Sequence, residues 1–506
     1  MAFILGDLLG SLMQQTKWTV AALSLGMLFA VTGCASDSAD RAGEADVQPK
    51  VSTVSDVANS TTATGDETNS TAASQQDGAA AASSVKQPVL YNTHLAPKVY
   101  GMRKFPYPYE AMLAISSDAD SETLRKFNLV HEFINTTQMT PLGRGLGLDF
   151  ADSFFMYNGN NEPGYVDIDQ EPMSDELSYF KGVSDEPYAA SVINHYIHVG
   201  WIDTMHTYGD FSRVNPHQTL FTRQLAKQAI QALKANGDAI TVWTDHGNKS
   251  NVDNFGDYGK SPFYSYQQGA NPWSKYYHTD LTIPYGIRFV WPDSSSDEFG
   301  MKSMIYPLML PDGQRVWGFW RYTNEGYTKK GDPEWNWTPF NLAEQLTPAH
   351  FAQIEREHEY SIVAQHLSGT NYPGVLPTSA VDALRLLAAQ YHEGKILVTR
   401  TSRLLTYNVT QQYVWYDVTY GQGKAYIHIR AILDPVFGRH VPTTNEIRGL
   451  TFYTSNPAAT VLEIGNTPIP AQLIQDNHSD GVHPSVAIKW WPVDTTNYAE
   501  TAPGVK

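Results

Sequence analysis

The chain is organised around a stretch that reads Ala111-Met-Leu-Ala-Ile-Ser-Ser-Asp118-Ala-Asp120-Ser-Glu-Thr123. Its apolar run is too short for a helix and gives way at once to small polar residues, which is typical of a buried strand that ends in a loop. Apolar residues then recur at helical spacing, and Ser121 is placed to cap the helix. Asp118 and Asp120 are therefore expected at the carboxyl end of a strand, where α/β proteins usually assemble their sites. A purely structural role in the turn and the cap stays open for both carboxylates.

Further along the chain, strand and helix patterns alternate over about 300 residues, which predicts an α/β fold with a parallel sheet and, as its expected form, a barrel. Periodic apolar residues predict helices, and short apolar runs predict strands. The expected helices are 189–198, 219–236 and 381–392, and the expected strands are 199–205, 239–243, 287–291, 316–322, 359–365 and 395–399. Gly237 directly follows the second of these helices and is expected to end it.

Polar side chains with chemical capability follow several of the predicted strands. They are Asp118, Asp120, His206, Asp245, His246, Asp293 and His366. Because the carboxyl ends of parallel strands lie on one face of a barrel, residues this far apart in sequence are expected to converge. A single histidine after a strand is more often structural than functional, but its repetition on several strands favours a site.

After residue 406 the pattern changes to short β runs divided by Gly, Pro and Asn, without helices between them. This pattern predicts a small antiparallel, sandwich-like all-β domain over 406–506. Such a domain suits either polysaccharide binding or packing against the main domain, and the sequence leaves both open.

The beginning of the chain has the layout of an export signal. An apolar run follows Lys17 and ends in Val31-Thr-Gly-Cys34, which resembles the lipobox of bacterial lipoproteins. The resemblance implies a signal peptide over 1–33, a lipid anchor on Cys34 and sorting to the outer membrane, with translation expected to begin at Met13. Residues 34–87 then lack the apolar content needed to fold, and are expected to form a disordered linker ahead of the main domain at 88–405.

The composition excludes some classes of partner. The chain has 506 residues and a net charge of −17 with no basic cluster, which argues against nucleic acid and against a polybasic membrane contact. Its single cysteine makes an internal disulfide impossible, which leaves lipidation as the expected use. The 12 Trp and 29 Tyr suit a protein that stacks rings on sugars, and suit a large aromatic core equally well.

Three short motifs, in this order, give the chain a resemblance to a known family. Asp118-Ala-Asp120, His206-Thr-Tyr-Gly-Asp210 and Ile362-Val-Ala-Gln-His366-Leu367 resemble the motifs of the NodB-like polysaccharide deacetylases, a family of carbohydrate esterases. The resemblance covers about residues 100 to 405 and implies a deformed (β/α) barrel of the glycoside hydrolase and deacetylase type. It also implies removal of N- or O-linked acetyl groups from a cell-surface or exported polysaccharide.

Carried over position by position, the resemblance implies that Asp118 is the base and His366 the acid. It implies that Asp120 and His206 bind a divalent metal ion, with zinc as the first candidate. The family has adjacent aspartates, a second histidine in its second motif and Leu-x-His in its last, whereas this chain has Ala119 between the aspartates, Asp210 in place of that histidine and Ala-Gln before His366. Either Asp210 or His246 is therefore the expected third ligand. The expected substrate contacts are Asp245, Trp291 and Asp293.

The chemistry accounts for these residue types. Hydrolysis of an acetamide or acetyl ester needs an activated water, a cation to polarise the carbonyl and a proton for the leaving group. Two histidines and a carboxylate suit zinc or a similar ion. Two alternatives remain: a glycoside hydrolase that uses paired carboxylates, and a non-catalytic glycan-binding lipoprotein with a degenerate deacetylase fold.

Overall fold

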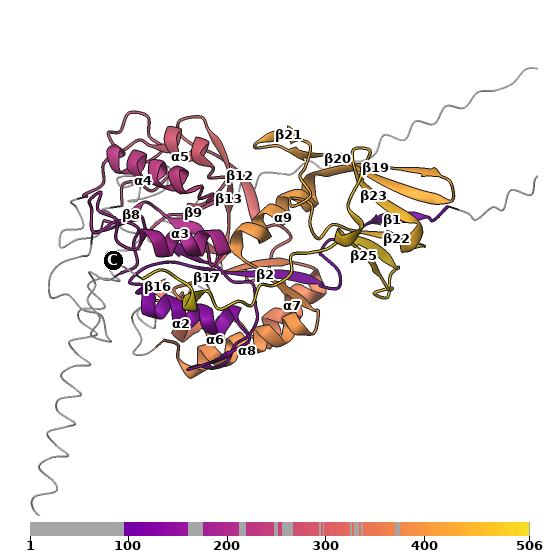
Figure 1. Cartoon of the computed structure of the whole chain (residues 1–506), viewed down its shortest axis with the longest axis horizontal. Helices are drawn as coiled ribbons and strands as arrows, with labels where there is room; N and C mark the ends of the chain where they lie inside the picture. Colours follow the sequence, from indigo (N-terminus) through magenta and orange to yellow (C-terminus); the bar gives the residue numbers. More distant parts are fainter. Residues whose placement is uncertain are drawn as a thin grey trace, which may run out of the picture. The chain divides into compact units, whose positions relative to one another are not determined.

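The structure is a computed structural model (Figure 1) that describes residues 96–159, 176–211, 219–246, 251–255, 267–292, 295–296, 298–323, 326–327, 333–334, 337–369 and 375–504. The predicted signal peptide, Cys34, the linker and Asp293 lie outside these residues. A search of the described helices for one with the length and apolar character of a membrane span found none.

A large sheet forms the centre of the fold and is parallel except at one edge. Its strands run in the order β11-β14-β17-β2-β5-β7-β9-β10-β13-β12, with β18 also paired to β2. They are β2 (Ala111–Ser117), β5 (Asp152–Phe154), β7 (Ile202–His206), β9 (Val242–Thr244), β10 (Phe289–Trp291), β11 (Ser295–Ser296), β12 (Ile305–Met309), β13 (Arg315–Phe319), β14 (Arg321–Tyr322), β17 (Tyr360–Gln365) and β18 (Ile396–Val398). Only β12 runs antiparallel to its neighbour. The predicted α/β class is confirmed, although among the described residues no pairing of β11 with β12 closes the sheet.

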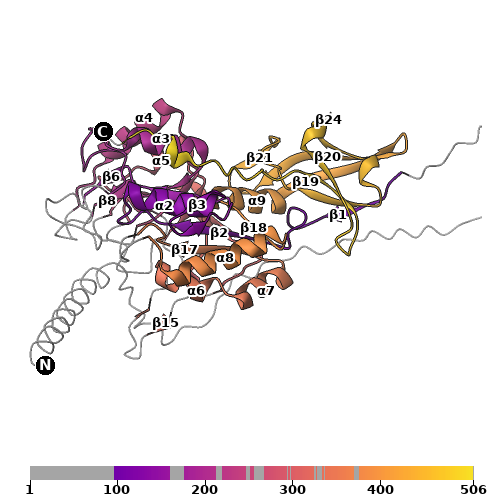
Figure 2. The same ribbon diagram turned by 60° about the horizontal axis from the view of Figure 1, so that its bottom comes forward.

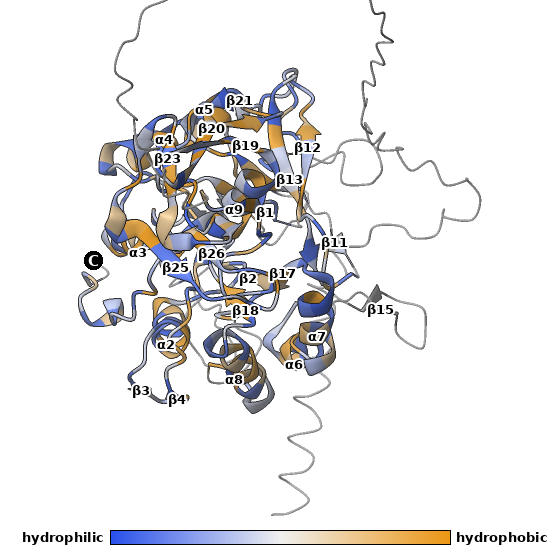
Figure 3. Ribbon diagram, turned by 90° about the vertical axis from the view of Figure 1, so that its right-hand side faces the viewer, coloured by the Kyte–Doolittle hydropathy of each residue, from blue (hydrophilic) through white to orange (hydrophobic). Residues whose placement is uncertain are grey.

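Helices cover the sheet, as Figures 1 and 2 show. They are α2 (Leu124–Asn135), α3 (Ala190–Val199), α4 (Arg223–Asn236), α5 (Thr279–Tyr285), α6 (Leu342–Gln345), α7 (Pro348–Glu357), α8 (Thr378–His392) and α9 (Thr401–Tyr413). In Figure 3, α2 and α8 show both hydrophilic and hydrophobic residues, as amphipathic helices do.

Strand β2 shows how the sheet is buried on both faces. Leu113 and Ile115 belong to the apolar cluster that includes residues of α2 and α8. Met112 and Ala114, which alternate with them, belong to a second cluster that includes Leu404 of α9. Because successive side chains of a strand point to opposite faces, a run buried at every position is what a strand between two layers requires.

The loop after β2 differs from the prediction at its cap. Thr123, not Ser121, caps α2: its side chain accepts a hydrogen bond from the backbone N–H of Lys126. Ser121 instead has a φ of 56°, in the left-handed region that residues with a side chain rarely adopt. The predicted Gly237 terminus of α4 is confirmed, with a left-handed φ of 73°.

Beyond α9, two further sheets share one apolar cluster. One has the order β1-β22-β26-β25 and the other β19-β20-β23-β24, with β21 beside β20. Their strands are β1 (Val99–Met102), β19 (Val414–Gly421), β20 (Lys424–Asp434), β21 (Gly438–His440), β22 (Thr451–Thr454), β23 (Thr460–Ile464), β24 (Thr467–Pro468), β25 (Ile474–Asn477) and β26 (Ser485–Ile488). The prediction of a purely antiparallel arrangement is wrong, because β20 and β23 run parallel.

Two features bear on the predicted boundary at residues 405 and 406. Helix α9, which the sequence analysis missed, runs through it. Strand β1, near the start of the described chain, pairs with β22 rather than with the central sheet. The described residues on both sides of the boundary belong to one compact unit, and the division into two domains stays a prediction.

We expect His131, which lies inside the fold, to make folding sensitive to acid. Its ring stacks on Trp201 at 4.8 Å, and burial lowers its pKa to about 3. The unfolded chain, with a histidine pKa near 6.5, therefore takes up this proton first as the pH falls. The contribution of neutral His131 to the free energy of unfolding is therefore complete above about pH 6.5. It is lost progressively as the pH falls toward 3, at up to ~1.4 kcal/mol per pH unit.

Chemical denaturation at several pH values would test this expectation on wild type and His131→Phe. The stability difference between the two should change in favour of the variant as the pH falls from 7 to 4. The difference cancels titrating groups that both proteins share, such as the buried Glu122 and Glu176, whose pKa values burial raises. A difference that stays constant over this range would contradict the assignment.

Candidate metal centre

Five of the predicted strand-end residues meet at one edge of the parallel sheet. Asp118 and Asp120 follow β2, His206 is the last residue of β7, His246 follows β9 and His366 follows β17. Strands β2 and β17 pair without a register shift as far as their last residues, Ser117 and Gln365. The backbone N–H of Asp118 extends this pairing by donating a 2.8 Å hydrogen bond to the carbonyl oxygen of Gln365. Parallel pairing thus brings side chains from across the chain to a common edge.

Three of these residues form a group that could hold a metal ion. One ligand atom each from Asp120, His206 and His246 lies within 4.8 Å of the other two. The Nε2 atoms of His206 and His246 lie 2.9 Å and 2.6 Å from the two carboxylate oxygens of Asp120. Two imidazole nitrogens and a carboxylate oxygen form a donor set that zinc and similar divalent ions favour. Asp118, Asp120 and His366 form a second, overlapping group.

The outer nitrogens of the two histidines differ in their hydrogen bonding. Nδ1 of His206 lies 2.8 Å from the Thr244 hydroxyl and 3.3 Å from its carbonyl oxygen, two acceptors that would hold a proton on Nδ1 when Nε2 binds a metal. Nδ1 of His246 lies 2.5 Å from the amide nitrogen of Asn251, whose oxygen accepts from the backbone N–H of Phe211. The Asn251 side chain thus presents its nitrogen to Nδ1 of His246, while Nε2 of His246 faces Asp120.

Asp210 lies behind this group rather than in it. Its carboxylate is 3.9 Å from Nδ1 of His246 and belongs to neither metal-capable group of the described residues. A metal on Nε2 of His246 requires a proton on Nδ1, and the Asp210 carboxylate is placed to attract that proton.

Asp118 is held by an arginine that the sequence analysis missed. Arg321, in β14, donates to both oxygens of Asp118 at 2.8 Å, and both residues are buried. The guanidinium also lies 3.5 Å from the ring centroid of Trp291, a cation–π contact that covers its face. The signal in the sequence was an arginine directly after the apolar run 316–320, because a cation buried with such a run requires a partner.

The negative charges of Asp118 and Asp120 are stabilised by positively charged neighbours. Burial raises the pKa of Asp118, but the Arg321 guanidinium and the His206 ring outweigh it and hold the pKa below its usual value. For Asp120, burial is likewise outweighed, first by His246, and its pKa lies well below the usual value. Burial acts to lower the pKa of His246, but the Asp120 carboxylate raises it to about 10. Both aspartates are therefore ionised at neutral pH.

His366 lies at the open side of the group. Its Nε2 is 3.7 Å from Asp118 and its Nδ1 is 3.8 Å from Asp120. The side chains of His366 and Asp120 are 23% and 24% exposed, whereas Asp118 is 5% exposed, so a ligand reaches the group past the first two. Burial lowers the pKa of His366 despite both carboxylates. The Trp337 ring stacks near it at 6.2 Å.

A second missed residue fixes the loop that holds the aspartates. Glu176 is fully buried, and its carboxylate accepts a 2.6 Å hydrogen bond from the backbone N–H of Ser121. This bond lies at the residue with the left-handed φ, next to Asp120. In the sequence, Glu176 stands outside the motifs and the predicted strands and helices, and so gave no signal.

The predicted substrate contacts have these positions in the structure. Asp245 is buried and accepts from the indole N–H of Trp243 at 2.8 Å and from the backbone N–H of Phe255 at 3.1 Å, so it links the end of β9 to Phe255. Trp291 is 7% exposed beneath Arg321. A role for either in substrate binding stays a prediction, and Asp293 lies outside the described residues.

The fold and the site together define a class: an α/β protein with a cluster at its strand ends that could hold a metal ion. Comparison of the chain with family models, curated proteins and solved structures found no match. Function is therefore to be inferred from the chemistry of the side chains at the site.

Proposed function

We propose that this chain is a metal-dependent hydrolase that removes acetyl groups from a cell-surface or exported polysaccharide. One observation supports the proposal above the others: Asp120, His206 and His246 form a metal-capable group with Asp118 and His366 beside it. In this proposal the sheet is a deformed (β/α) barrel, and a lipid on Cys34 anchors the chain to the bacterial outer membrane.

The proposed ligands are Asp120, His206 and His246, with Asp210 in support of His246. A zinc or similar ion at these residues would polarise the acetyl carbonyl and make water a better nucleophile near neutral pH. Asp118 is ionised and aligned by two hydrogen bonds from Arg321, so it is placed to take a proton from water. His366, on the open side, would return a proton to the leaving amine or alkoxide.

The glycoside hydrolase alternative fits the same residues less well. That chemistry needs one carboxyl group that keeps its proton while a second is ionised. Asp118 and Asp120 both have lowered pKa values because cationic groups surround them. Neither is suited to be the acid.

The experiment is metal analysis of the purified chain, together with acetate release from acetylated oligosaccharides. We expect about one metal ion per chain, loss of acetate release on chelation, and recovery on adding back zinc or another divalent ion. Absence of metal even after reconstitution would reject the proposal. Metal without acetate release from any acetylated glycan would favour the non-catalytic alternative.

A further inference from the structure

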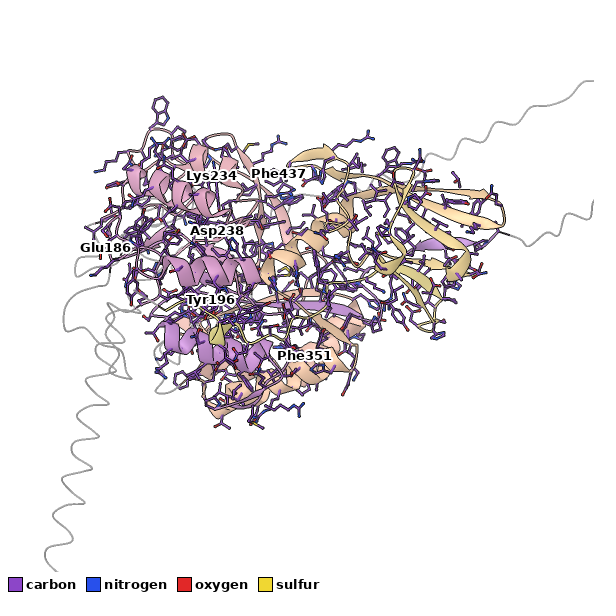
Figure 4. The ribbon with its side chains drawn as sticks, in the orientation of Figure 1. Glu186, Tyr196, Lys234, Asp238, Phe351 and Phe437 are labelled. Carbon is purple, nitrogen blue, oxygen red and sulfur yellow. The ribbon has the colours of Figure 1, made fainter. Side chains whose placement is uncertain are left out.

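A cavity of about 610 Å³ lies at the opposite ends of the strands from the metal-capable group. Thr241 and Arg288, in its lining, directly precede β9 and β10, whereas His246 follows β9. The backbone N–H of Arg288 donates to the Thr241 carbonyl at 2.8 Å, which ties the two strand starts together. Helix α9, the segment 437–448 and the pair Trp490 and Trp491 complete the lining, and Figure 4 labels Phe437 on the second of these. The volume suits a small ligand.

The lining is positive in a chain that is strongly negative. Arg288, Arg403 and Arg448 line the cavity, with Glu446 as the only acid among its residues. Glu446 already has a partner, because its carboxylate lies 2.6 Å from Nε2 of His440. The net charge of the whole chain is −17, so a group of arginines gives this cavity a charge opposite in sign to that of the chain as a whole.

The three arginines are only partly neutralised. Arg403 pairs with Asp149 at 2.8 Å, and Arg288 lies 3.3 Å from Asp434. The Arg288 side chain remains 35% exposed beside this pair. Among the described residues, the hydrogen bonds of Arg448 go to neutral oxygens, those of the Asn445 side chain and the Lys489 backbone, both at 3.3 Å. Unsatisfied guanidinium groups favour an anionic ligand.

Aromatic rings hold these guanidinium groups in place. Arg403 and Arg448 both lie over the ring of Trp491, at 4.6 Å and 4.4 Å from its centroid. Arg288 lies 4.7 Å from the ring centroid of Phe437. Stacking on a ring occupies the face of a guanidinium and leaves its N–H edge for a carboxylate or phosphate. The site is thus preorganised for a planar, two-point contact with an anion.

We propose that this cavity binds an anionic sugar, one that has a carboxylate or a phosphate on a hydroxyl-rich ring. The arginines would bind the anion, while hydroxyl groups of α9 and the Asn445 amide, which also line the cavity, would bind the sugar hydroxyls. The site is separate from the metal-capable group, and it stands whether or not the chain is a hydrolase.

Isothermal titration of the full-length chain tests the proposal with glucuronate, glucose 6-phosphate, glucose and inorganic phosphate. We expect at least one sugar anion to bind ~10-fold or more tightly than glucose and inorganic phosphate, with affinity that falls as salt rises. Arg448→Gln and Arg288→Gln should each weaken it ~10-fold or more, and the matched exposed variant Arg356→Gln should not. Which anion binds distinguishes a carboxylate from a phosphate ligand.

Equal affinity for glucose, no binding of either sugar anion, or phosphate binding as tight as the sugar anions would each overturn the proposal. So would unchanged affinity in both folded arginine variants. If these variants do not fold, Arg448→Lys is the substitute, because it keeps the positive charge but loses the two-point hydrogen bonding of the guanidinium. Its affinity for the sugar anion should fall by less than that of a charge-removing variant, and unchanged affinity would again overturn the proposal. Acetate release by Arg448→Gln without ligand should equal that of wild type, which keeps this test independent of the hydrolase proposal.

Discussion

Asp118→Asn is expected to keep its metal and lose acetate release by about 10²- to 10⁴-fold. The asparagine retains the shape of the side chain and one oxygen for Arg321, but it cannot accept a proton from water. Asp118 is not one of the three proposed ligands, so metal content should stay near that of wild type. Metal analysis and steady-state kinetics on the same samples measure both quantities.

His206→Ala provides the contrasting result, since it removes a ligand atom 2.9 Å from Asp120. It should lose metal and acetate release together, as should Asp120→Ala/His206→Ala. His478→Ala, on the exposed turn after β25, and Asp382→Asn, on α8, are the matched controls and should change neither. Full activity of His206→Ala would reject the metal-centre assignment, and full activity of Asp118→Asn would reject the proposed base.

Asp149→Asn is expected to destabilise the fold by about 3–5 kcal/mol, as breaking a buried ion pair does. Asp149 is buried and accepts from the Thr399 hydroxyl at 2.6 Å. It also accepts from Arg400 at 2.6 and 2.9 Å and from Arg403 at 2.8 Å. The asparagine would take the directly bonded counter-charge from two largely buried guanidinium groups. Denaturant unfolding measures the loss, for which Asp382→Asn, in an exposed pair on α8, is again the control, with at most ~0.5 kcal/mol expected.

The same substitution has a defined pH dependence. Burial raises the pKa of Asp149, but the two arginines outweigh this and lower it to about 2. A carboxylate whose pKa is lowered by folding stabilises the fold above its unfolded value, near 3.9, and loses this contribution as the pH falls toward 2. The difference between wild type and Asp149→Asn should therefore be larger at pH 5 than at pH 3. An equal difference at both values would contradict the role of the charge.

Strand and helix periodicity predicted much of the α/β core and the position of the site. Strand β2 was predictable because a short buried run ended abruptly in polar residues, and the same signal marked β7, β9 and β17. Since parallel strands end on one edge, the approach of Asp120, His206 and His246 followed from the strand assignments alone. The sequence could not decide between Asp210 and His246, because that choice depends on which of the two side chains, one following β7 and the other following β9, approaches Asp120 in space.

The missed features depend on tertiary contacts. Helix α9 has β-branched and polar residues such as Thr401, Thr406 and Thr410, whose weak helix propensity hid it, and it is stabilised by burial of Leu404 and Leu405. Arg321 and Glu176 reach the site from segments with no motif. Their roles arise from partners about 200 and 55 residues away in sequence, Asp118 and Ser121, which no local pattern encodes.

The pairing of β1 with β22 has a consequence for how the protein is made. Val99 is opposite Thr454, so β1 has no partner strand until the chain has been synthesised beyond residue 454 and β22 has left the ribosome. During that interval its hydrogen-bonding edge is open to other chains, and in a truncated product that ends before β22 it stays open. Chaperone demand and the yield of fragments should thus depend on this one late pairing, and a C-terminal fragment that begins at residue 406 would lack the strand that covers β22.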